Sequence, residues 1–293
     1  MSETYILACD IGTSTTKSSI VDMQGRVLGT ATKGYQVEYP VERWAEQDPR
    51  VYWDALTTTA REIVTRTKIN PRSVIAFTVD AMMASVIPVD NKGNPLRKTI
   101  LWHDVRSVNY VSPLMNQFLI PDMLAKNIIP VVSAKDPLPK VLWVKHEEPH
   151  LFKKAAKFVD VKDWILFQSG IGDFYTDWSN VCLWNYFRID THQPESEIIE
   201  EGLGLTMDHF STIVKTTDIL GNLSKEAADQ LGLTTETQVV CGCGDLVAVS
   251  LGSGAIAPGK PHLYIGSSGW ISQHQEHPQF DLSGVGTIES AIP

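Results

Sequence analysis

An apolar strand that ends in an acid and a turn of glycine and hydroxyl residues opens the chain and most constrains its fold. Residues 5–9 (YILAC) are typical of a buried β-strand, and residues 16–22 (TKSSIVD) fit its antiparallel partner. Asp10 and the Gly12-Thr-Ser-Thr15 turn stand between them. Gly12 permits a positive φ and a close approach to a ligand, while hydroxyl and N–H groups suit phosphate oxygens. The stretch predicts a β-hairpin whose turn is either an ordinary tight turn or a phosphate-binding loop.

Helix and strand patterns alternate along the rest of the chain. Asp48-Pro49 is typical of a helix start, and apolar residues then recur at helical spacing to about Arg66. The other expected elements are a turn at 23–26, a strand at 27–35, strands at 74–79 and 85–90, a turn at 91–95, mixed helix and loop at 112–155, a strand, cap, helix and glycine stop at 157–170, a strand at 238–245, a small-residue helix at 246–255 and a strand–loop–strand at 261–273. This order predicts an α/β fold, with a mixed sheet and β-hairpins flanked by helices.

Composition narrows the classes of partner. The formal net charge of -9 argues against nucleic acid or an anionic membrane as a partner, but it is compatible with a phosphorylated ligand. No apolar run approaches the ~20 residues of a membrane span, and the N-terminus lacks the features of a signal peptide. The four cysteines, of which Cys241 and Cys243 are poorly spaced for a disulfide or a metal, are expected to be reduced. We therefore expect a cytoplasmic protein.

A second acid, Asp245, ends the run QVVCGCGD at 238–245. The glycines allow close backbone approach, and the acid falls where a strand passes into a helix. A carboxylate there is either a helix N-cap or a base. In phosphoryl transfer to an alcohol, such a base orients the attacking hydroxyl and accepts its proton. Asp245 fits the second role if it faces the same cleft as the opening turn.

Two weaker motifs point toward a phosphate and a polyol. The turn Gly266-Ser-Ser-Gly269 resembles the opening turn and would supply a second phosphate contact, although an ordinary hairpin turn explains it equally. Trp102, Asp104 and Arg106 offer a stacking face and hydrogen-bonding groups of both signs, which suit a polyol. The alternative is a salt bridge beside a core tryptophan.

The run His146-Glu-Glu-Pro-His150 matches the zinc motif H-E-x-x-H in letters only. That motif needs a continuous helix to bring both histidines to one metal ion. Pro149 lacks an N–H and disfavours helix in the residue before it. We therefore expect no zinc site here.

A series of motifs in this chain resembles the FGGY carbohydrate kinases of the actin-like ATPase superfamily, and most closely their xylulokinase-like branch. The motifs are DIGTSTTK at 10–17, WAEQDPRVYWDAL at 44–56, MASVIPVD at 83–90, ILWHDVRS at 100–107, LPKVLWVKHEEPHLF at 138–152, GCGD at 242–245 and GSSG at 266–269. They occur in family order over nearly the whole chain. The resemblance implies an actin-like (ribonuclease H-like) lobe and ATP-dependent phosphorylation of a sugar or polyol hydroxyl. A ketopentose such as a xylulose or ribulose would be the substrate, with ATP and Mg²⁺ as cofactors.

The motifs and the resemblance together assign three groups of site residues. Asp245 would be the general base, and Asp10 and Asp245 would lie near the Mg²⁺ ion. The residues expected to contact the nucleotide phosphates are Asp10, Gly12, Thr13, Ser14, Thr15, Lys17, Gly266, Ser267, Ser268 and Gly269. The residues expected to contact the sugar are Met83, Ala84, Trp102, Asp104 and Arg106.

The chain departs from the family in two ways. Xylulokinases usually carry Met-His at the sugar-contact pair, and Met83-Ala84 stands here, which questions D-xylulose itself. Family members are also considerably longer and have two lobes. We expect residues 1–246 to form the first lobe and residues 247–293 to begin a second, nucleotide-binding lobe that is truncated. A chain of this kind would have little kinase activity alone, and its exposed apolar surface would favour a homodimer.

Two other functions remain open on the sequence. The opening turn also resembles that of the small ATPase activators of the actin-like superfamily, which commonly hold an iron–sulfur cluster between subunits. The spacing of Cys241 and Cys243 is poor for such a cluster, and an absence of iron would argue against that class. The other alternative is a non-catalytic sugar-binding fragment, which calorimetry with a sugar panel beside a turnover assay would separate from an enzyme.

Overall fold

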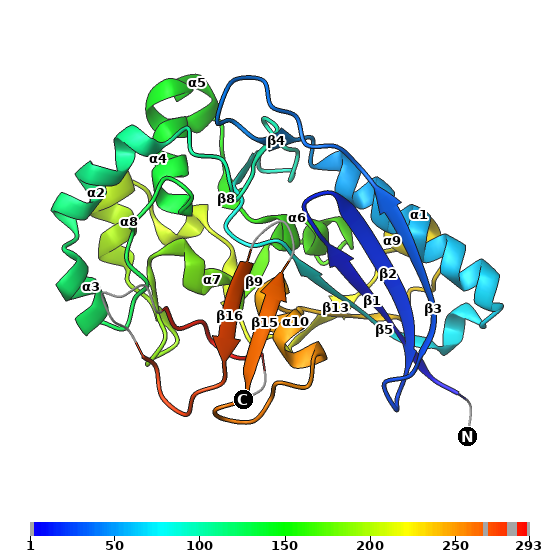
Figure 1. Cartoon of the computed structure of the whole chain (residues 1–293). Helices are drawn as coiled ribbons and strands as arrows, with labels where there is room; N and C mark the ends of the chain where they lie inside the picture. The colour runs from blue at the N-terminus through cyan, green and yellow to red at the C-terminus, as the bar shows by residue number, and fades with distance from the viewer. Residues whose placement is uncertain (1–2, 266–268, 280–285, 292–293) are drawn as a thin grey trace.

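A six-stranded mixed sheet forms the centre of the molecule (Figure 1). The computed structural model describes residues 3–265, 269–279 and 286–291. In spatial order the strands are β13 (Ile219–Asn222), β14 (Gln238–Val240), β5 (Val74–Ala81), β1 (Tyr5–Ile11), β2 (Thr15–Asp22) and β3 (Val27–Gly34). β14, β5 and β1 are parallel to one another, whereas β13, β2 and β3 run antiparallel to their neighbours. The predicted mixed sheet with β-hairpins is confirmed.

The opening β-hairpin forms as its sequence predicts. β1 alternates strictly between buried and partly exposed residues, and it pairs with β2 from Tyr5 opposite Asp22 to Ile11 opposite Thr16. Leu7, Cys9 and Ile11 are buried, so Asp10 lies on the other face of the strand. The carboxylate of Asp10 therefore avoids the apolar core although its strand runs through the middle of the sheet.

Three helices cover the face of the sheet that carries Leu7, and together they enclose the first core. They are α1 (Arg50–Thr67), α6 (Val161–Gln168) and α9 (Lys225–Leu231). α1 begins one residue later than the Asp48-Pro49 signal suggests: Pro49 is the N-cap, and Asp48 accepts a hydrogen bond from the Arg50 N–H at 3.0 Å. α6 has the predicted strand before it, β8 (Lys157–Val159), and a capping box in which Asp160 is the N-cap.

A second apolar core lies among the helices drawn on the left of Figure 1. These helices are α2 (Val111–Gln117), α3 (Ile120–Ala125), α4 (Pro137–Glu147), α5 (Pro149–Phe152), α7 (Trp178–Val181) and α8 (Ser196–Leu203). The short strands outside the central sheet include β4 (Glu46–Gln47), β6 (Ile87–Val89), β7 (Thr99–Ile100), β9 (Tyr175–Asp177), β10 (Phe187–Arg188), β11 (Gln193–Pro194) and β12 (Thr212–Val214). The prediction of mixed helix and loop at 112–155 is confirmed.

The H-E-x-x-H match is interrupted, as Pro149 predicts. α4 ends at Glu147 and α5 begins at Pro149, so His146 and His150 lie on different helices. The His146 ring instead stacks on Tyr110, with ring centroids 5.3 Å apart.

The chain ends with α10 (Asp245–Gly252) and a hairpin of β15 (Pro261–Ile265) and β16 (Gly269–Gln273). The expected division at residue 246 stays a prediction. Among the described residues, no helix has the length and apolarity needed to cross a membrane. All four cysteines are free.

Candidate active site

The turn between β1 and β2 presents its carbonyl groups to the protein. The Gly12 carbonyl accepts from the Tyr35 hydroxyl at 2.6 Å, the Thr13 carbonyl from Gln47 Nε2 at 2.8 Å, and the Ser14 carbonyl from the Tyr35 N–H at 2.9 Å. In a trans peptide the N–H points opposite to the C=O, so the amides that follow these carbonyls face the other way. Consecutive outward N–H groups beside the exposed Ser14 and Thr15 make a surface suited to anionic oxygens.

Lys17 lies across the hairpin from Asp10. Its Nζ is 3.8 Å from Asp10 Oδ2, and the two residues are register partners. Burial raises the pKa of Asp10, and the positive charge of Lys17 partly opposes that rise. The sequence left the direction of this lysine open, and the structure turns it toward the phosphate-loop acid.

Three carboxylates meet where the parallel strands end. Asp10 on β1 and Asp80 on β5 are register partners and lie on the same face of the sheet. Gly244 continues the β14–β5 pairing through a parallel bridge to Ala81, which brings Asp245 to the same edge. Burial, followed by the charges of Asp10 and Asp245, raises the pKa of Asp80 well above its usual range. No local motif marks Asp80 in the sequence, and the parallel register of β1 and β5 reveals it.

Asp245 is the first residue of α10. Its Oδ1 accepts a hydrogen bond from the Leu246 N–H at 2.7 Å, and the N-cap position belongs to Gly244. Burial, together with the charge of Asp10, raises the pKa of Asp245 to about 6. Asp245 is therefore not the N-cap residue, and its partly buried carboxyl group is electrostatically coupled to Asp10 beside the opening loop.

These carboxylates would suit a divalent cation that is also held by water and phosphate oxygens. Hard cations take carboxylate oxygens, and the mutual repulsion of the three acids would be relieved by positive charge. Within the described part of the chain, no three His, Cys, Asp or Glu side chains are close enough to form a metal site by themselves. Mg²⁺ typically keeps several waters and uses one or two carboxylates together with substrate phosphates, so Asp10 and Asp245 fit it in that manner.

Close packing against β5 fixes the loop that leads to Asp245. A Cβ on Gly242, which has φ +73°, would lie 2.0 Å from the Val79 carbonyl oxygen. A Cβ on Gly244 would lie 2.4 Å from Met83 Sδ. Both glycines are therefore required by space, and Gly242 also by its left-handed backbone conformation. The buried Met83, an expected sugar contact, thus packs directly beside the residue before Asp245.

Ala84, the other half of that pair, has a left-handed backbone with φ +61°. The fully buried Lys140 donates from Nζ to the Ala84 carbonyl at 2.8 Å, to the Lys135 carbonyl at 2.7 Å and to the Trp102 carbonyl at 3.4 Å. Burial lowers the pKa of Lys140 to about 7, and the charge of Asp104 opposes this. One side chain therefore holds two segments that carry expected sugar contacts.

Trp102 connects its own segment with the opening Gly12–Thr15 loop. Its indole Nε1 donates to Thr13 Oγ1 at 3.0 Å, although the two residues lie 89 positions apart in the sequence. The Trp102 ring is partly exposed and stands next to the His103 ring, with centroids 4.9 Å apart. It remains available as a stacking face at the same end of the sheet as Asp10.

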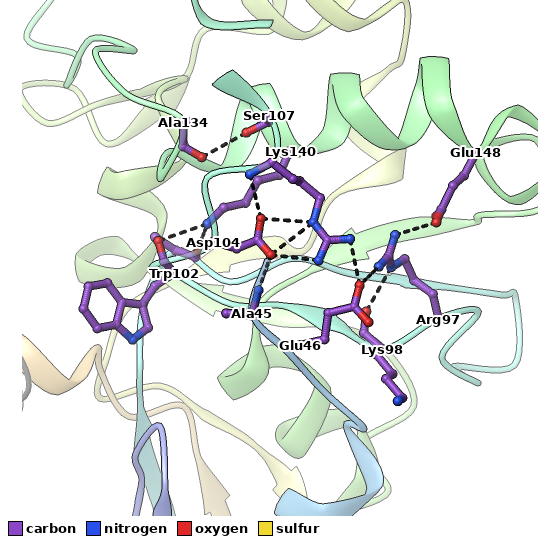
Figure 2. Close-up of polar contacts among 12 residues, drawn as sticks. Ala45, Glu46, Arg97, Lys98, Trp102, Asp104, Ser107, Ala134, Lys140 and Glu148 are labelled. Atoms are coloured by element: carbon purple, nitrogen blue, oxygen red, sulfur yellow. Dashed lines mark hydrogen bonds and ion pairs between the residues drawn. The ribbon is translucent and has the colours of Figure 1, made fainter. Parts of the chain in front are cut away.

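Asp104 and Arg106 lie in a buried ionic network with Glu46. Figure 2 shows Asp104 and Glu46 in this network. Both side chains are 0% exposed, and Arg106 Nη2 is 2.8 Å from Asp104 Oδ2. Arg106 Nη1 is 2.7 Å from Glu46 Oε1, and the guanidinium lies over the Trp44 ring at 3.9 Å from its centroid. The Ala45 N–H donates to Asp104 Oδ2. These contacts anchor the segment that follows Trp102 against residues 44–46, and direct sugar contact by Asp104 or Arg106 stays a prediction.

The family model for the N-terminal domain of the FGGY family of carbohydrate kinases matches residues 5–252. The chain belongs to the FGGY family of carbohydrate kinases. Its lobe has the actin-like ATPase fold that the sequence predicted.

Similar FGGY-family proteins include sugar and sugar-acid kinases. A gluconokinase from Bacillus subtilis (strain 168) is 31% identical over 281 residues, which cover 96% of this chain and 54% of the relative. A xylulose kinase from the same organism is 27% identical, with 96% and 55% covered. The crystal structure of gluconate kinase from Lactobacillus acidophilus superposes with a TM-score of 0.87 at 25% identity, covering 96% of this chain and 56% of that one. The chain thus spans about half the length of the relatives it matches.

The structure brings most of the expected FGGY site residues to one region. Asp10, the Gly12–Thr15 loop and Asp245 meet at the strand ends, with Met83 and Trp102 beside them. Gly266, Ser267 and Ser268 lie outside the described residues, and Gly269 begins β16. The second phosphate loop therefore stays a prediction.

Proposed function

We propose that this chain supplies the sugar site, the phosphate loop and the general base of an ATP-dependent kinase. The substrate would be a sugar or polyol, of the ketopentose type such as a xylulose or ribulose. The observation that carries the proposal is the meeting of Asp245 with Asp10 and the Gly12–Thr15 loop at one edge of the sheet. In this proposal, residues 1–246 form the sugar and phosphate-loop lobe, and residues 247–293 begin the nucleotide lobe.

The proposed reaction is an in-line transfer of the γ-phosphoryl group. The sugar hydroxyl oxygen forms a bond to the γ-phosphorus while the bond from that phosphorus to the β,γ-bridging oxygen breaks, and ADP leaves with the electron pair. The hydroxyl proton passes to Asp245, whose pKa of about 6 suits a base that works near neutral pH. The amides and hydroxyls of the Gly12–Thr15 loop, with Lys17 beside them, would hold the oxygens of the transferred group.

A divalent cation fits the same edge of the sheet. Asp10 and Asp245 are the residues that would hold Mg²⁺, through water or through phosphate oxygens. When bound, the ion would offset the negative charge of the nucleotide phosphates. The pairing of β1 with β2 holds Asp10 and Lys17 opposite each other on the hairpin, with Lys17 Nζ 3.8 Å from Asp10 Oδ2.

The sugar site is the part of the proposal that distinguishes substrates. Ala84 offers a methyl group where a histidine would offer a hydrogen-bonding ring, so fewer polar contacts hold the sugar hydroxyls at this position. Trp102 would stack on the carbon face of the substrate. The relatives named as gluconokinase, xylulose kinase and glycerol kinase supply gluconate, xylulose and glycerol for the panel to test, and ribulose is added as a second ketopentose.

The deciding experiment replaces Asp245 with Asn in the full-length gene product. Phosphoryl transfer is measured by ADP release over the panel above, and sugar binding is measured by calorimetry. We expect Asp245→Asn to abolish transfer, with a loss of about 10²–10⁴-fold, since it removes the proton acceptor and one of the two carboxylates that would hold Mg²⁺. Sugar affinity should stay within about threefold, because Asn keeps the shape and one acceptor oxygen.

The matched control is Asp54→Asn, the same chemical change at an exposed position on α1. This substitution should leave both the rate of ADP release and the affinity for sugar as in the unmodified protein. Ordinary turnover by Asp245→Asn would rule out Asp245 as the base. An absence of ADP release with every compound, in a protein that binds ATP, would overturn the kinase proposal itself.

A further inference from the structure

A buried ion pair lies behind the loop that carries Asp245. Lys162 on α6 places its Nζ 3.1 Å from Asp177 Oδ1, and both side chains are 0% exposed. The other carboxylate oxygen of Asp177 accepts hydrogen bonds from the N–H and from the hydroxyl of Ser179. Lys162, Asp177 and Ser179 thus form a connected polar chain, here named the Lys162 network.

The Lys162 network ends on the backbone of the Asp245 loop. Because Ser179 donates its hydroxyl proton to Asp177, the lone pairs of Oγ are free to accept, and they accept from the Gly244 N–H at 3.0 Å. Lys162 Nζ also lies 3.4 Å from the Cys241 carbonyl oxygen. One ion pair therefore reaches both ends of the Cys241–Gly244 segment.

The orientation of this chain has a chemical consequence. The negative charge on Asp177 polarises the Ser179 hydroxyl, which strengthens its acceptance from Gly244. A buried ion pair is weak evidence for stability, because desolvation of both charges offsets their attraction. This ion pair contacts the loop that carries Asp245, directly at Cys241 and through Ser179 at Gly244, which argues that it holds that loop in position.

We propose that the Lys162 network is a positioning device that fixes the carboxylate of Asp245 relative to the phosphate loop. Ser179 is the positioning residue that acts on Gly244, and Lys162 holds Asp177 in place. The inference rests on the proposed role of Asp245 as the base. Gly244 is held on its other side by Met83 and by the bridge to Ala81, so loss of the Ser179 contact would free only one side of the loop.

The test is Ser179→Ala, with Ser169→Ala as its matched control. Ser169 is also fully buried, and its alanine variant loses one hydroxyl hydrogen bond, to the Leu166 carbonyl at the end of α6, whereas Ser179→Ala loses the hydroxyl bonds to Asp177 and from Gly244. Hydrogen exchange at the Gly244 amide is measured by NMR without sugar or nucleotide. We expect Ser179→Ala to raise that exchange rate about tenfold, as the loss of one buried hydrogen bond predicts, and Ser169→Ala to leave it unchanged.

The values of kcat and KM distinguish a positioning role of Ser179 from a general loss of stability. In the full-length gene product, Ser179→Ala should lower kcat about 10- to 100-fold while the KM for the sugar stays within about twofold. Ser179→Thr, which restores a hydroxyl, should recover most of kcat. If Ser179→Ala does not give folded protein, Ser179→Cys keeps the volume with a weaker acceptor and should show the same pattern.

Equal Gly244 exchange in the Ser179 and Ser169 variants would overturn the inference, as would a kcat that Ser179→Ala leaves unchanged. The amide measurement needs no turnover. A failed base assignment therefore appears as activity in Asp245→Asn, whereas a failed positioning role appears as an unchanged Gly244 amide.

Discussion

Replacement of Arg106 by Met tests how much the buried network of Figure 2 contributes to the fold. The substitution removes the guanidinium and leaves Asp104, which is 0% exposed, with only backbone N–H partners. Breaking a buried pair by removing one partner typically costs about 3–5 kcal/mol. Loss of the stacking on Trp44 adds to that cost, since the guanidinium lies 3.9 Å from the ring centroid.

The free energy of unfolding is measured from urea titrations followed by tryptophan fluorescence. The control is Arg50→Met, because Arg50 pairs with Asp48 at the same two-residue spacing. Its side chain is 77% exposed, so we expect almost no change in the free energy of unfolding. The reasoning would be refuted if the two substitutions destabilised the chain equally.

A second variant tests whether the unpaired carboxylate of Asp104 causes the loss of stability in Arg106→Met. Asp104→Asn combined with Arg106→Met removes the uncompensated charge and keeps an acceptor for the Ala45 N–H. The double variant should therefore be more stable than Arg106→Met alone. A double variant that is less stable would show that lost packing, and not the stranded carboxylate, dominates the cost.

Two further predictions concern Lys140 and Gly242. The pKa of Lys140 is lowered to about 7 from its usual 10.5, so between these pH values the unfolded chain binds more protons than the folded one. The free energy of unfolding should therefore rise with pH across this range because of Lys140, by at most about 1.4 kcal/mol per pH unit. Unfolding titrations from pH 7 to pH 10 should show this rise in the unmodified chain relative to Lys140→Met, and parallel profiles would contradict it. Gly242→Ala should destabilise the chain far more than Gly254→Ala, because both glycines have positive φ but only Gly242 would force a Cβ to 2.0 Å from a carbonyl oxygen. Equal melting temperatures for the two variants would contradict that expectation.

Local signals in the sequence were sufficient for the hairpins and the helix starts. The alternation in β1 and the glycine of the opening turn predict their own geometry, because both depend on residues within one strand pair. The same holds for the Asp160 cap of α6 and for the break at Pro149. Asp245 was found in the same way, since an acid between a strand and a helix stands out in the sequence.

Contacts between distant segments were not predictable in this way. Asp80 becomes a neighbour of Asp10 only through the parallel register of β1 and β5. The contact between Ser179 and Gly244 spans 65 positions, and no spacing rule connects them. The pattern Trp102-His-Asp104-Val-Arg106 does not reveal whether the arginine faces solvent or the interior, and tertiary packing decides that it is buried.

The hydrogen bond between Trp102 and Thr13 joins the two halves of the proposed site through one hydroxyl group. Thr13 Oγ1 accepts the indole proton and keeps its own proton to donate, so in the proposed site a phosphate oxygen and the sugar-stacking ring would meet at the same atom. A ligand that turned this hydroxyl would then also change the hydrogen bond to the indole. By thermodynamic reciprocity, whatever factor sugar occupancy applied to phosphate affinity, phosphate occupancy would apply to sugar affinity. The bond between these two side chains would therefore give the proposed site a means of cooperative binding.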